Sequence, residues 1–167
     1  MTRIISALLL ALAAPPALTH LYPAGARQGT TVSVALGGTF ERWPVGVWLE
    51  GAGVEAKAEK AKGRVTVTVA ADAVPGPRWL RVHDAQGASV PRRFIVGTVP
   101  EVMEKEGKDP MTVEGDAVVN GRLAKAGEVD RFAVKLAKGR TLVASVMAHR
   151  LGSPMDGVLQ VASAKGF

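Results

Sequence analysis

The sequence predicts an all-β protein built from two β-sandwiches in tandem. Short apolar–polar alternations recur along the chain, and clusters of Gly and Pro separate them. The composition agrees, because 19 Gly, 10 Pro and only 5% aromatic residues favour many short strands joined by turns. With 47% hydrophobic residues in 167, the chain has material for one large or two small cores.

Residues 1–19 predict a cleavable signal peptide. Arg3 supplies the positive charge, residues 4–14 form an apolar run, and Ala11-Leu12-Ala13 offers small residues for cleavage. This run is shorter than the about 20 residues that a membrane-spanning helix needs. We therefore expect export to the periplasm, the cell surface or the medium, with no membrane span after cleavage. A retained N-terminal anchor is the alternative.

Residues 20–98 predict an immunoglobulin-like sandwich. In the clearest strand, residues 64–70, three valines alternate with threonines, so that Val65, Val67 and Val69 share one face. The charged stretch 54–62 has no apolar stripe and predicts an edge strand or loop, with a short surface helix as the alternative. The remaining strands are expected, in order, at residues 31–36, 45–49, 79–82 and 94–96.

Residues 99–110 read as an acidic linker, and residues 111–167 predict the second sandwich. Asn120-Gly121 is a turn signal because both residues tolerate positive φ. The strand expected at 131–136 would face Phe132, Val134 and Leu136 inward. Further strands are expected at residues 141–147 and from 158 to 161.

The first half resembles the IPT/TIG immunoglobulin-like domains. The residues that carry this resemblance are Gly29-Thr30 at the entry to a strand, Gly37-Gly38-Thr39-Phe40, and Pro75-Gly76-Pro77-Arg78-Trp79-Leu80-Arg81-Val82. The resemblance implies a spacer or an interaction surface, since such domains share a fold more than a partner.

The second half resembles the bacterial pre-peptidase C-terminal domain, through residues 127–132 (Gly-Glu-Val-Asp-Arg-Phe), 138–142 and 150–156. This resemblance implies a jelly-roll-like sandwich attached to secreted peptidases and other exported proteins. The family domain continues through more strands, so the resemblance implies an incomplete second sandwich followed by downstream domains. An incomplete sandwich would leave unpaired edges and an uncovered apolar face after Leu123, which predicts aggregation or disorder.

Clustered carboxylates in and beyond the linker make calcium the candidate cofactor, although none is required for the predicted fold. Calcium takes six to eight hard oxygens. In collagen-binding relatives of the family, a Glu-x-Glu-x-Asn-Asp linker holds calcium, and here Lys108 stands in place of the Asn. The alternative is a solvated linker with an aspartate that caps the strand entry. The candidate ligands are Glu104, Glu106, Asp109, Glu128 and Asp130.

Three further residues are candidate ligand contacts. Trp43 precedes Pro44 in a turn, where an exposed indole is expected, whereas Trp48 and Trp79 are expected in the core. Arg150 and Asp156 flank a polar loop and are expected to bond its backbone or each other, with ligand contact as the alternative.

The sequence does not predict an enzyme. It has no Cys, no HExxH and no Gly-x-Ser-x-Gly, and its three His are isolated. The net charge of +6 comes from scattered basic residues that show no interleaving with aromatics, which argues against nucleic acid.

The prediction for function is a non-catalytic scaffold or binding region of an exported bacterial multidomain protein. It would serve adhesion, spacing or substrate targeting, with a protein or polysaccharide ligand. One alternative is an accessory region of a secreted hydrolase, a peptidase by resemblance, whose catalytic domain lies outside this chain. The other alternative is a carbohydrate-binding module that uses the Trp residues.

Overall fold

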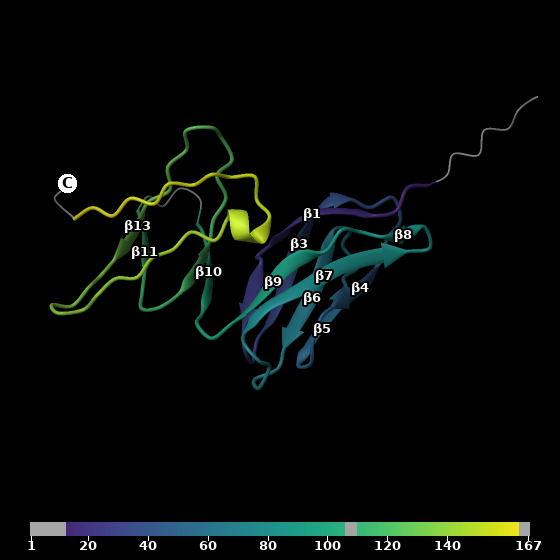
Figure 1. Ribbon diagram of the computed structural model, residues 1–167, viewed down its shortest axis with the longest axis horizontal. Coiled ribbons are helices and arrows are strands. Elements are labelled where there is room, and N and C mark those ends of the chain that lie inside the picture. Colours follow the sequence, from purple (N-terminus) through teal and green to yellow (C-terminus); the bar gives the residue numbers. More distant parts are fainter. Residues whose placement is uncertain (1–12, 106–109, 164–167) are drawn as a thin grey trace, which may run out of the picture.

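The computed structural model describes residues 13–105 and 110–163, and these are nearly all β, which confirms the predicted fold class. Residues 17–97 form a two-layer sandwich, and residues 101–163 form a smaller and more open region beside it (Figure 1). No helix within the described residues has the length and apolarity needed to span a bilayer.

The first layer of the sandwich has four antiparallel strands in the order β1-β3-β6-β5. The strands are β1 (Ala17–Tyr22), β3 (Thr31–Thr39), β6 (Arg64–Val69) and β5 (Val54–Ala58). Since β1 begins at Ala17 and Leu18 is only 3% exposed, the sandwich starts inside the segment predicted as a leader. Cleavage after Ala13 would leave β1 whole.

The second layer has the order β2-β9-β7-β4, and β8 extends it beside β7. The strands are β2 (Gly25–Arg27), β9 (Arg92–Gly97), β7 (Gly76–Asp84), β4 (Gly46–Leu49) and β8 (Gly87–Ala88). Strand β2 runs parallel to β9, whereas the other pairs are antiparallel.

The core lies between these two layers and follows the period-2 alternation of the strands. Val65, Val67 and Val69 of β6 are buried, as predicted, and they belong to the same cluster as Leu80 and Phe94 of the second layer. Burying one such side chain contributes about 1.5–3 kcal/mol, so this closed core stabilises the whole sandwich.

The charged stretch after Gly53 is an edge strand, which confirms one of the two expectations for it. Strand β5 pairs with β6 and ends the first layer. Lys57 and Glu55 are exposed on it and form an ion pair with 3.6 Å between Nζ and Oε2. Such an exposed pair adds little stability, but charged side chains on an edge oppose pairing with another sheet.

The exposure of the three tryptophans is the reverse of what the sequence predicts. The indole N–H of Trp43 donates to the Glu59 carbonyl oxygen at 2.8 Å, and the ring packs edge-on against Phe40, so Trp43 is half-buried. Trp48 and Trp79 are instead 47% and 41% exposed. The reason is strand alternation: Trp48 lies between two inward-facing residues of β4 and therefore faces outward.

The second region contains two short parallel pairs and one turn of 3₁₀ helix. Strand β10 (Glu101–Met103) pairs with β12 (Val118–Asn120), and β11 (Met111–Val113) pairs with β13 (Phe132–Val134). The helix η1 spans His149–Leu151. The prediction of strands at residues 141–147 and 158–161 is wrong, because the backbone there is irregular.

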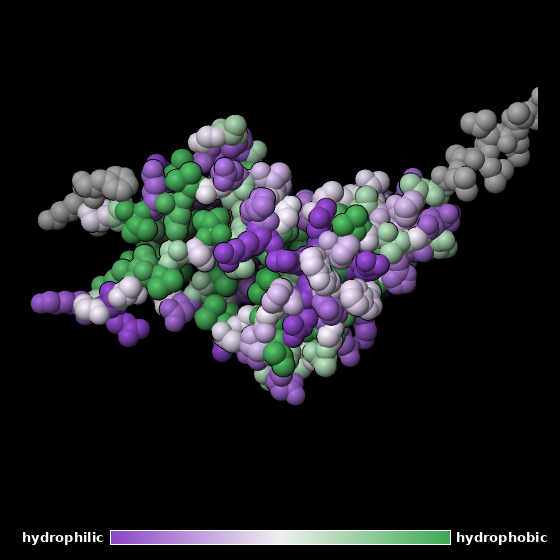
Figure 2. Space-filling model, in the orientation of Figure 1, coloured by the Kyte–Doolittle hydropathy of each residue, from purple (hydrophilic) through white to green (hydrophobic). Residues whose placement is uncertain are grey.

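The prediction that Phe132 and Val134 of β13 face inward is also wrong, because no second layer of described residues covers them. Met111 and Val113 are buried, whereas the large apolar side chains around them are exposed. Figure 2 shows apolar surface gathered at this end of the molecule. The exposed residues include Leu123, Val129, Phe132, Val134, Leu136, Leu142, Val143, Val146, Met147, Val158, Leu159 and Val161.

Candidate functional site

The outer face of the second layer carries the most distinctive group of side chains. It includes Trp48, Trp79, Arg81, His83 and Arg93, which alternate with the core residues along β4, β7 and β9. Because alternate side chains of a strand point to opposite sides of the sheet, these five lie on its solvent side.

Strand register places one arginine on each exposed tryptophan. Trp48 of β4 lies opposite Arg81 of β7, and Trp79 of β7 lies opposite Arg93 of β9. The guanidinium carbons lie 5.9 Å and 5.2 Å from the centroids of the two indoles, within cation–π range. Trp48 and Trp79 are diagonal neighbours, which places their Cα atoms about 7–8 Å apart.

His83 continues this row toward the end of β7. Its ring packs against the backbone of its partner Gly46, where a Cβ would stand only 2.2 Å from Cε1 of the imidazole. Glycine at position 46 therefore allows the imidazole to lie close to the sheet.

The guanidinium groups of the outer face are not neutralised by neighbouring carboxylates. The only ion pair between described residues joins Lys57 and Glu55, on the other layer. Nε of Arg81 is buried and has no hydrogen-bond partner in the described part of the chain. Glu50 is the nearby acid, and its carboxylate accepts a hydrogen bond from the Trp79 backbone N–H at 3.1 Å.

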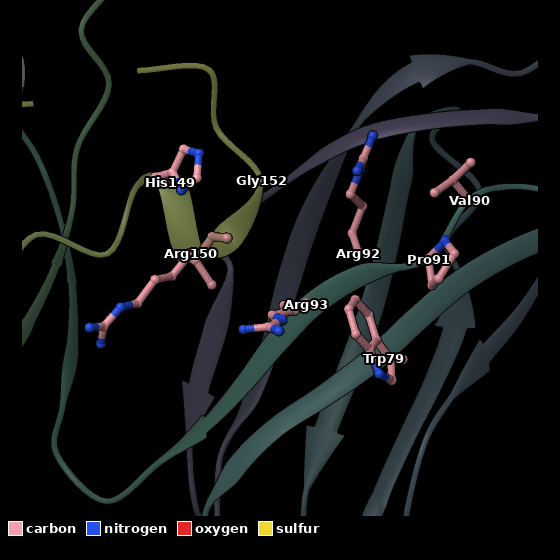
Figure 3. Close-up of a pocket in the computed structure, with 9 residues that line it drawn as sticks. Trp79, Val90, Pro91, Arg92, Arg93, His149, Arg150 and Gly152 are labelled. Atoms are coloured by element: carbon pink, nitrogen blue, oxygen red, sulfur yellow. The ribbon is translucent and has the colours of Figure 1, made fainter. Parts of the chain in front are cut away.

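An open hollow of about 450 Å³ lies where the outer face meets η1. Figure 3 shows Arg93 between Trp79 and the turn that carries His149 and Arg150. A second open hollow, of about 390 Å³, is lined by Trp48 and Arg81. The lining of the first hollow is Trp79, Val90, Pro91, Arg92, Arg93, His149, Arg150, Leu151 and Gly152.

Two local contacts shape the rim of the larger hollow. Nε–H of Arg92 donates to the carbonyl oxygen of Leu18 at 3.0 Å, which ties the arginine to β1. The turn η1 ends at Gly152, whose φ of 84° is a left-handed conformation suited to glycine. The Gly152 N–H donates to the His149 carbonyl oxygen at 3.0 Å and closes the turn.

The expected roles of Arg150 and Asp156 are not observed. The loop is held by its own backbone bonds and by the Ser153 hydroxyl, which accepts from the Met155 N–H at 3.2 Å. Asp156 is exposed, and no described residue bonds to its side chain or to that of Arg150. Arg150 instead lines the larger hollow, because η1 brings it next to β9.

The candidate calcium ligands are only partly brought together. A Cβ at Gly121 would lie 3.1 Å from Oε2 of Glu104 and 3.8 Å from Oδ2 of Asp130, so both carboxylates approach this glycine. Oε2 of Glu104 also accepts the Arg122 N–H at 3.0 Å. Glu128 is occupied differently, since its carboxylate accepts the backbone N–H groups of Ala124 and Lys125 at 2.6 and 2.9 Å.

Glu106 and Asp109 lie outside the described residues, as does Lys108. Among the residues that the structure does describe, no three His, Cys, Asp or Glu side chains gather as a metal-binding group. Calcium binding thus stays a prediction. Glu104 and Asp130 are the two candidate ligands that both approach Gly121.

A half-buried carboxylate lies where the sandwich meets the second region, next to Gly25 of β2. Glu101 accepts a hydrogen bond from Nδ2 of Asn120 at 2.5 Å, and the Asn120 carbonyl oxygen accepts one from the Tyr22 hydroxyl at 3.2 Å. Burial raises the pKa of Glu101, and the Asn120 hydrogen bond opposes part of that rise. The junction therefore disfavours the charged form of this carboxyl group relative to the same group in water.

Sequence reasoning missed the arginine–tryptophan pairs of the outer face. The expectation that basic residues are not interleaved with aromatics is wrong there, because register brings Arg81 and Arg93 onto two indoles. The available signal was alternation: since Val47 and Leu49 face the core, Trp48 must face outward.

Comparisons with protein-family models, with curated proteins and with solved structures found no match to this chain. The resemblances to IPT/TIG and pre-peptidase C-terminal domains therefore stay predictions that rest on the quoted residues.

Proposed function

We propose that this chain is a non-catalytic binding region of an exported protein, and that its outer face binds a polysaccharide by stacking sugar rings on Trp48 and Trp79. The observation that carries the proposal is the presence of two exposed indoles that are diagonal neighbours on one face of a sheet. Each presents a large apolar surface that remains accessible to a ligand.

The outer face combines apolar rings with cationic groups in a small area. Trp and Arg are both enriched at protein interfaces, so the choice of a polysaccharide rests on how the two kinds of group alternate and not on residue type. Here a guanidinium lies over each indole, and Arg81 is opposite Trp48 across the strands and two residues from Trp79 along β7. A polysaccharide presents apolar ring faces and hydroxyl groups at short intervals. It therefore suits a surface on which indole rings and guanidinium groups alternate.

The two hollows also favour a polymer over an enclosed small molecule. Both are open, and one lies at each Trp–Arg pair. Small-molecule sites usually enclose most of their ligand, whereas a chain that crosses a sheet needs only shallow seats. The non-catalytic part of the proposal rests on the sequence, which has no Cys and no nucleophile–base motif.

Binding to a polysaccharide array tests this proposal. We expect the wild-type chain to bind and the double variant Trp48→Ala/Trp79→Ala to lose binding, while Lys57→Ala, on the opposite layer, binds normally. The double variant keeps Trp43, whose half-buried indole reports by fluorescence that the sandwich is folded. Equal binding by the wild type and the folded double variant would refute the proposal.

A further inference from the structure

We infer that the polysaccharide is acidic, and that the hollow between Trp79, Arg93 and η1 seats one of its anionic groups. This inference rests on the proposed function, because it names the ligand class of the same face. The anionic group is a carboxylate or sulfate carried by a sugar ring.

The charge of the larger hollow is the first argument. Three arginines and one histidine are among the nine residues that line it, and none of the nine is Asp or Glu. Guanidinium groups remain charged at any physiological pH. Figure 3 shows that Arg92 extends toward β1 and that Arg150 points away from Arg93, so Arg93 is the cation that lies beside the Trp79 indole. An anion seated beside Arg93 would be attracted by this positively charged lining.

The geometry of Arg93 is the second argument. The guanidinium carbon of Arg93 lies 5.2 Å from the centroid of the Trp79 ring, and this cation–π contact restricts where the guanidinium lies. Its N–H groups make no hydrogen bond to any residue that the structure describes. A stacked guanidinium presents a rigid set of donors that matches the two oxygens of a carboxylate or sulfate.

Repetition of the Trp–Arg unit is the third argument. Trp48 and Arg81 form a second pair beside the first, with their own open hollow. Nε of Arg81 is buried, so its terminal N–H groups are the donors that a ligand on this face could reach. Two adjacent pairs, each with one ring surface and one cation, fit a polymer in which sugar rings and acid groups recur.

Single-stranded nucleic acid also combines flat rings with regular negative charge. The leader-like residues 1–19 favour a ligand outside the cytoplasm. This expectation favours the polysaccharide, and nucleic acid binding is a competing outcome of the test.

The test measures dissociation constants for a polyuronate, the same polymer after reduction of its carboxyl groups, and a single-stranded oligonucleotide. Proteins are the wild type, Arg93→Gln, Arg81→Gln and the control Arg64→Gln, whose side chain lies on the opposite layer beside Ser33. Circular dichroism verifies the fold of each variant.

We expect the polyuronate to bind at least about tenfold more tightly than its reduced form, because hydrogen bonds to charged groups contribute about 1.5–3 kcal/mol. We expect Arg93→Gln to weaken polyuronate binding by about tenfold as well, with a smaller loss for Arg81→Gln and none for Arg64→Gln. Added salt should weaken polyuronate binding.

Three outcomes overturn the inference. If both polymers bind equally and binding requires Trp48 and Trp79, the ligand is a neutral polysaccharide and only the proposed function stands. If neither polymer binds and the oligonucleotide does, the proposed function fails as well. If Arg93→Gln and Arg64→Gln bind the polyuronate with the same affinity, the hollow is not the anion seat.

Discussion

The sandwich of residues 17–97 and the region of residues 101–163 use similar alternating sequences with different results. In the sandwich, two layers of strands enclose Val67, Leu80 and Phe94 completely. In the second region, Met111 and Val113 are buried while Phe132 and Val134 are each 40% exposed. An apolar strand face thus gains stability only where another layer covers it, because burial and not alternation supplies the free energy.

The largest expected difference between the two regions is in amide hydrogen exchange. Amides of the central strand β6 should exchange only on global unfolding, with an opening free energy of about 5–15 kcal/mol. Amides of β13, which has one short parallel partner, should exchange with much smaller opening energies. Native-state exchange measures both, and equal protection in β6 and β13 would contradict the comparison.

The second largest expected difference is in the stability cost of a matched pair of phenylalanine substitutions, one in each region. Phe94→Ala removes a fully buried ring and should lower the unfolding free energy by about 3–5 kcal/mol. Phe132→Ala removes a ring that is already 40% exposed and should cost about 1 kcal/mol or less. Urea unfolding followed by tryptophan fluorescence measures the first cost, since all three tryptophans lie in the sandwich, and amide hydrogen exchange of β11 and β13 measures the second. A similar cost at the two positions would mean that the second region has a closed core.

Tryptophan-to-phenylalanine changes sharpen the contrast within the sandwich itself. Trp43→Phe leaves the Glu59 carbonyl oxygen without its 2.8 Å hydrogen bond and should cost about 1–3 kcal/mol. Trp48→Phe, at an exposed ring, should change stability by about 0.5 kcal/mol or less. Chemical denaturation of both variants gives the comparison, and the opposite order would place Trp43 outside the core.

The smallest expected effect concerns the junction between the two regions. Because burial raises the pKa of Glu101, the folded state holds that proton more tightly than the unfolded chain does. Its contribution to stability is greatest below the usual glutamate pKa and declines as pH rises through the raised value.

Glu101→Gln should therefore slightly raise the melting temperature at neutral pH, since the neutral amide keeps an acceptor oxygen for Asn120. It should also remove the part of the pH dependence that Glu101 causes. Melting curves across the acidic to neutral range test this, and a lower melting temperature for Glu101→Gln at neutral pH would contradict it.

Alternation predicted the sandwich well where strands were long and well separated. The valines of β6 and the edge position of β5 followed from the residues alone. In the second region the same reasoning failed at Val143 and Val158, which are exposed in irregular backbone. Alternation reports which residues share a face of a strand, but not whether a partner strand exists.

The candidate site was harder to predict for a related reason. The outward direction of Trp48 followed from its neighbours, whereas its pairing with Arg81 depends on the register between β4 and β7. Register involves residues more than thirty positions apart and is set by the whole sheet. The hollow beside Arg93 depends further on η1, which comes from the other region.

The parallel pair of β2 and β9 has a mechanical consequence. These strands lie near the beginning and at the end of the sandwich, and Gly25 pairs with Ile95 while Arg27 pairs with Gly97. A pulling force on the two ends would slide β2 and β9 past each other along their length. All bonds of the pair would then bear load together rather than one at a time, so this pair resists tension that reaches β2 and β9 by shear.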